Sequence, residues 1–151
     1  MRIGERDAPS LDMHRTVSFL TQNYASFVYD HLVTFPFGAD AAHPYDERIL
    51  PGLAERWETS SDGKTITFHL RRGATFHNKP PVDGREVTAE DVVYSLERFA
   101  RLSGFRGNFA PVERIEAVDS HTVRLVTREP YAPLLSHLAQ PSNAVVLPKE
   151  L

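Results

Sequence analysis

Strict alternation of apolar and polar residues between Trp57 and Arg71 is the strongest structural signal in the chain. Ile66, Phe68 and Leu70 alternate with polar neighbours, and an Asp-Gly pair at residues 62–63 precedes the alternating run. Asp-Gly between alternating segments is typical of a tight turn, because glycine readily takes positive φ. The pattern predicts a β-hairpin with one buried face.

A capped helix and a second hairpin follow this first hairpin. Thr88 and Asp91 have the spacing of a capping box, and apolar residues recur on one helical face as far as Ala100. Alternation returns in Glu113–Thr127, with a turn expected at Asp119-Ser120. Hairpins mixed with helices, without regular βαβ alternation, favour an α+β fold of antiparallel hairpins packed with a few amphipathic helices.

The remaining segments give weaker signals. Thr16–Leu32 carries apolar residues at spacings of three and four, which predicts a helix. Pro133 is expected to open a short helix, and Ala144–Leu147 resembles a final strand. Residues 38–45 and 78–85 are expected to form loops.

Composition excludes several classes of protein. A chain of 151 residues fits a single domain, and its formal net charge of −3 offers no basic excess for nucleic acid. The absence of cysteine excludes disulfides, thiolate zinc sites and a cysteine nucleophile. The N-terminus lacks the apolar core of a secretory signal, so the protein is either cytoplasmic or given without its signal.

The histidines are scattered along the chain and show no paired spacing for a metal site. We interpret them as ordinary surface or capping residues and expect no metal ligand among them. Ser10, Asp12 and His14 are residue types of a nucleophilic triad, but they lie too close together in an irregular segment to form one. The seven positions are His14, His31, His43, His69, His77, His121 and His137.

Three ordered stretches carry a family resemblance. Leu50–Glu58, Asp62–His77 and Thr88–Leu96 closely resemble the signature of the extracellular solute-binding proteins of family 5, the peptide and nickel receptors of bacterial ABC importers. The likeness extends more loosely to Ser10–Asp12 and Ile115–Pro130.

The resemblance implies a part of the first lobe of a two-lobed periplasmic-binding-protein type II fold. Residues 1–151 would then be a single domain or a fragment of lobe I, with a satellite subdomain at about 45–130. The implied function is the capture of oligopeptides or a related small solute for an ABC permease of the inner membrane. The location would be periplasmic, or extracellular and tethered to the membrane. No catalytic residue, metal or cofactor is expected, and no nucleic-acid partner.

The resemblance also places three regions near the ligand: the start of the first helix, the loop after the capped helix, and the turn before the final strand. Amides and a guanidinium there suit a peptide or a carboxylate, because they pair with backbone groups without selecting side chains. The candidate ligand-binding residues are Gln22, Asn23, Phe105, Arg106, Ser142 and Asn143.

Two other functions stay open from the sequence. One is a metal-dependent hydrolase that uses His77 with Asp83 or Glu90, and the other is a free-standing protein-interaction module.

Overall fold

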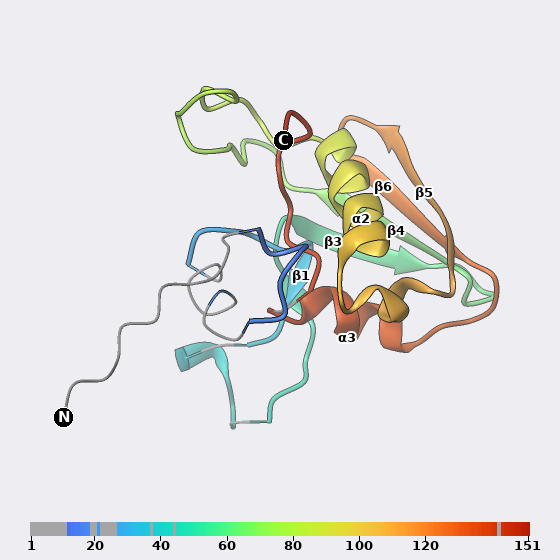
Figure 1. Ribbon diagram of the computed structural model, residues 1–151. Coiled ribbons are helices and arrows are strands. Elements are labelled where there is room, and N and C mark those ends of the chain that lie inside the picture. Colours follow the sequence, from blue (N-terminus) through green and yellow to red (C-terminus); the bar gives the residue numbers. More distant parts are fainter. Residues whose placement is uncertain (1–11, 19–20, 22–26, 37, 44, 142) are drawn as a thin grey trace.

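The computed structural model describes residues 12–18, 21, 27–36, 38–43, 45–141 and 143–151. Its centre is a four-stranded antiparallel sheet with the order β3-β4-β6-β5 (Figure 1). The strands are β3 (Ala54–Thr59), β4 (Thr65–Leu70), β5 (Val112–Asp119) and β6 (Thr122–Thr127).

Both predicted hairpins are confirmed. In β4 the apolar residues of the alternating run are buried and their neighbours are partly exposed, and β6 shows the same pattern. Phe68 pairs with Trp57 on one side and with Val123 on the other, so the two hairpins join through β4 and β6. Gly63 has φ +69° in the first turn, as the Asp-Gly pair requires.

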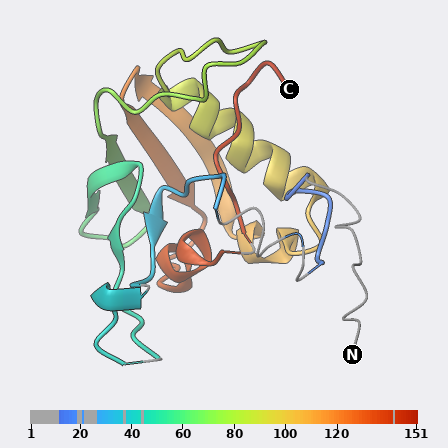
Figure 2. The ribbon, with the colours of Figure 1, turned by 90° about the vertical axis from the view of Figure 1, so that its left-hand side faces the viewer.

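Helices cover one face of this sheet. α2 (Ala89–Leu102) begins at the predicted capping box and lies across the sheet in both views (Figures 1 and 2). Its buried residues Val92, Leu96 and Phe99 join Phe68 and Leu125 in the main hydrophobic core. Smaller elements complete the described structure: β1 (Val33–Thr34), η1 (Gly38–Asp40), β2 (Leu50–Pro51), η2 (Arg106–Phe109) and α3 (Pro133–Ala139).

The helix predicted for Thr16–Leu32 is wrong at both ends. Residues 16–18 and 27–32 are not helical, and Phe27 on the expected buried face is 85% exposed. The backbone carbonyl of Asp30 accepts the N–H of Val146, and that of His31 accepts the N–H of Leu53. These bonds to distant segments replace the internal bonds of a helix. Thr21 is helical, and residues 19–20 and 22–26 lie outside the described residues.

The final strand predicted at Ala144–Leu147 is also wrong, although all four residues are buried. The N–H of Leu147 donates to Ser95 Oγ at 2.8 Å, and no strand pairs with this segment in the described part of the chain. Apolar burial without a sheet partner produced the same sequence pattern as a buried strand. Within the described ranges, no helix is long and apolar enough to cross a membrane.

Candidate functional site

The loop after α2 positions two of the predicted ligand residues. Ser103 ends the helix, and its Oγ accepts the N–H of Phe105 at 3.0 Å. The guanidinium of Arg106 donates from Nη1 to the carbonyl of Ser103 at 3.2 Å. Phe105 packs against the core while Arg106 remains exposed. Among the described residues no ion pair involves Arg106, so its charge is available to an anionic group.

Asn143 lies four residues beyond the end of α3 and is only 2% exposed. Its Nδ2 donates to the carbonyl of His137 at 2.7 Å, and its N–H donates to the carbonyl of Gln140 at 2.9 Å. The Nδ2 group of Asn143 therefore satisfies one backbone carbonyl in the last turn of α3. Oδ1 is the other polar atom of the Asn143 side chain.

Two of the three predicted ligand regions adjoin elements that contact each other at one edge of the molecule. η2 and α3 are in contact there, at the lower end of α2 in Figure 1. Arg106 is the first residue of η2, and Asn143 lies four residues beyond the end of α3. Gln22, Asn23 and Ser142 lie outside the described residues.

An ion pair that the sequence did not reveal holds the N-terminal segment against α2. Arg98 donates to both carboxylate oxygens of Asp12, at 2.8 and 2.6 Å. The Arg98 guanidinium lowers the pKa of Asp12 below its ordinary value. The pair joins residues far apart in the chain, and neither has a local sequence signal.

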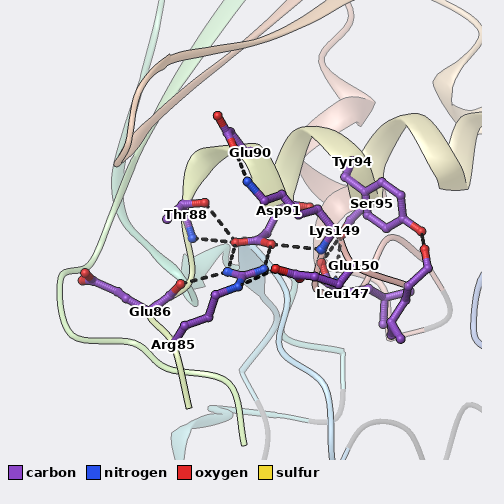
Figure 3. Close-up of polar contacts among 11 residues, drawn as sticks. Arg85, Glu86, Thr88, Glu90, Asp91, Tyr94, Ser95, Leu147, Lys149 and Glu150 are labelled. Carbon is purple, nitrogen blue, oxygen red and sulfur yellow. Dashed lines mark hydrogen bonds and ion pairs between the residues drawn. The ribbon is translucent and has the colours of Figure 1, made fainter. Parts of the chain in front are cut away.

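A polar network lies at the start of α2 (Figure 3), and the sequence predicted only the capping part of it. The buried Asp91 caps the helix as predicted, accepting the N–H of Thr88 at 2.9 Å. It also accepts two bonds from Arg85, at 2.6 and 2.8 Å, and Arg85 continues to Glu150 at 2.5 Å. Burial acts to raise the pKa of Asp91, but the hydrogen bonds from Arg85, Thr88 and Lys149 outweigh it and lower the pKa. The network connects residues 149–150 to the N-terminal end of α2.

The hydrolase alternative gains no support from the described residues. His77 lines a cavity of about 890 Å³, whereas Glu90 lines a different cavity and pairs with Lys149. Asp83 lines neither cavity. No three histidines or carboxylates within the described ranges gather closely enough to hold a metal ion.

The prediction of ordinary surface or capping histidines is wrong for His14. This residue is fully buried, and His31 also buries its ring nitrogen Nε2. Their spacing along the chain gave no sign of burial, because it arises from contacts with residues 141–145.

Residues 48–150 match the bacterial extracellular solute-binding proteins, family 5, in the middle region of that family. The chain belongs to this family. Among curated family relatives, the dipeptide-binding protein of Escherichia coli K12 is 39% identical over 138 residues, which are 82% of this chain and 24% of the relative. A di/tripeptide-binding protein of Pseudomonas aeruginosa is 35% identical over 121 residues, 68% of this chain and 22% of the relative. The chain thus spans about a quarter of the length of these family 5 relatives.

Solved structures confirm the α+β fold and its match to part of the periplasmic-binding-protein type II fold. A binding protein of Agrobacterium tumefaciens R10 in complex with mannopinic acid has a TM-score of 0.80 at 33% identity, over 93% of this chain and 27% of that one. A periplasmic binding protein of Helicobacter pylori in complex with the peptide STSA has a TM-score of 0.76 at 28% identity, over 95% and 30%.

Proposed function

We propose that this protein belongs to the substrate-binding component of an ABC importer and captures oligopeptides or a related small solute for a membrane permease. The observation that carries the proposal is the 39% identity to a dipeptide-binding protein over most of this chain. The fold match to a binding protein that holds a peptide supports it.

We further propose a place for the chain within such a receptor. It would form part of lobe I, with residues of about 45–130 as a satellite subdomain. The receptor would act in the periplasm, or outside the cell tethered to the membrane, and deliver its solute to the permease of the inner membrane. The family's description as extracellular supports this location.

The ligand would carry a carboxylate that Arg106 binds. Peptides have one at the C-terminus, and the solute of one structural neighbour is mannopinic acid. An exposed guanidinium without a carboxylate partner in the described part of the chain suits such a group, because it can donate two parallel hydrogen bonds. Gln22, Asn23, Phe105, Ser142 and Asn143 would complete this side of the site, with Asn143 contributing Oδ1.

A chimera tests both parts of the proposal. The chimera is the E. coli dipeptide-binding protein with this chain in place of the region that it matches. It should fold and bind dipeptides in calorimetry. Arg106→Gln in the chimera should weaken binding about tenfold or more, since hydrogen bonds to charged groups contribute about 1.5–3 kcal/mol.

Arg101→Gln is the matched control, because Arg101 is an exposed arginine in the last turn of α2, the helix that precedes the loop of Arg106. A folded chimera without dipeptide binding would refute the proposed function. Equal affinities for Arg106→Gln and Arg101→Gln would refute only the role of Arg106.

A further inference from the structure

His14 is a buried histidine with one ring nitrogen bonded and the other unpartnered. Nε2 lies 3.1 Å from the carbonyl oxygen of Val145, which can only accept, so Nε2 carries the proton. The ring meets the edge of Phe99 at 5.8 Å between centroids. Nδ1 is buried and has no hydrogen-bond partner. The neutral ring therefore fits this position, and a second ring proton would have no acceptor.

His31 is a second histidine with one unpartnered buried ring nitrogen and a backbone carbonyl beside its ring. The backbone carbonyl of Pro141 acts as an acceptor toward its ring and raises its pKa, and its Nε2 is buried without a partner. Beside it, the N–H of Val146 donates to the carbonyl of Asp30 at 2.9 Å. His14 and His31 thus both interact with backbone carbonyls close together in the sequence, those of Val145 and Pro141.

Burial favours the neutral forms of the two rings, against several of the polar groups around them. Burial is the main cause that lowers the pKa of each histidine to about 4. Arg98 and His31 add to this effect at His14, whereas the hydrogen bond to the carbonyl of Val145 and the charge of Asp12 oppose it. Asp30 and the carbonyl of Pro141 oppose it at His31. The cavity that His31 lines also carries further titratable groups, namely Arg71, Arg72, His77 and Lys79.

We propose that His14 and His31, with the carbonyls of Val145 and Pro141, form an acid-sensitive clasp that releases residues 12–14 and 30–31 from residues 143–147 when the rings are protonated. A protonated ring would bury a charge and an N–H group without an acceptor, and both costs favour opening. The clasp rests on contacts within the chain, so its test needs no ligand and can fail without touching the proposed function.

The direction of the pH effect follows from the pKa values. A histidine whose pKa falls from 6.5 to about 4 on closing stabilises the closed form fully above pH 6.5, and this stabilisation is lost as the pH falls toward 4. Between these values, each histidine should raise the opening constant by up to about tenfold per pH unit.

Amide hydrogen exchange on the 151-residue chain measures this opening directly. The N–H of Val146 reports the clasp, because its bond to Asp30 joins the two regions, and Val123 and Leu125 in β6 report the sheet. The protection factor of Val146, corrected for intrinsic exchange, should fall up to about a hundredfold per pH unit between pH 6 and 5, while the two sheet amides stay protected. An equal fall at all three amides would mean global unfolding and would overturn the clasp.

Variants assign the effect to the two rings. His14→Gln and His31→Asn place an amide donor near the bonded ring nitrogen but cannot be protonated, so together they should remove the pH dependence at Val146. His43→Gln, at an exposed histidine outside the clasp, should leave it unchanged. An unchanged pH dependence in the double variant would overturn the proposal. NMR titration of the unmodified chain checks the same point without substitution, and a midpoint near 6.5 for either ring would also overturn it.

Discussion

Gly52 lies where two backbone segments approach each other closely. A Cβ at this position would lie 2.4 Å from the carbonyl oxygen of His31 and 2.9 Å from that of Leu32. Both carbonyls accept hydrogen bonds from residues 52–54, so neither can move freely. We expect Gly52→Ala to lower the free energy of unfolding by about 1–3 kcal/mol in urea denaturation. Gly107→Ala, with no atom within 4 Å of its Cβ, is the control and should be near neutral.

Substitution of Asp91 should lower the stability of the fold far more than substitution of its neighbour Glu90. Asp91→Asn removes the charge opposite Arg85 in a buried position, which costs about 3 kcal/mol for pairs of this kind. Glu90→Gln breaks an exposed pair with Lys149 and should cost less than about 1 kcal/mol. Thermal melts of the two variants should differ clearly. Similar melting temperatures would mean that the network at Arg85 contributes little.

Single residues were predictable where their role is local. Asp91 was expected as a cap because Thr88 stands three residues before it. Its pairing with Arg85, the continuation to Glu150, and the Asp12–Arg98 pair had no sequence signal, since the partners meet only after folding. His14 was misjudged for the same reason, because Val145 and Phe99 come from distant segments.

At the scale of elements, the β3–β4 hairpin depends on Gly63. A valine there would have to adopt φ +69°, and its Cβ would lie 3.3 Å from Cβ of Pro130. We expect Gly63→Val to destabilise the chain by at least about 1–2 kcal/mol in a thermal melt, because β-branched residues rarely adopt positive φ. Gly107→Val, at an open position without positive φ, controls for the loss of glycine. An unchanged melting temperature for Gly63→Val would contradict the turn assignment.

Elements with several agreeing local signals were predicted correctly, as was α3, which Pro133 opens as expected, whereas two segments with only an apolar pattern were predicted wrongly. In α2 the cap, the apolar face and the acidic first turn all agree, and the helix begins where they place it. In residues 16–32 and 144–147 only an apolar pattern was present. In the described parts of these segments, the N–H of Val146 bonds to Asp30 and that of Leu147 to Ser95, so tertiary contacts decided the conformation there. The candidate site followed the same rule, because its residues came from a family resemblance rather than from a local chemical motif.

At the scale of the whole molecule, this chain spans about a quarter of the length of its curated relatives. In the proposed function the ligand is held between two lobes, and this chain supplies part of one. Association costs several kcal/mol in lost translational and rotational freedom before any contact is counted. The guanidinium of Arg106 at the start of η2 cannot offset that cost alone.

We therefore expect the 151-residue chain to bind peptides no more tightly than about millimolar, which corresponds to about −4 kcal/mol. Isothermal calorimetry against a library of di- and tripeptides measures this affinity. The matched chimera, which restores the second lobe, should bind the same peptides much more tightly, because the ligand then loses more of its surface to the protein. Micromolar binding by the chain alone would contradict the two-lobed arrangement, since it would place a complete site within these 151 residues.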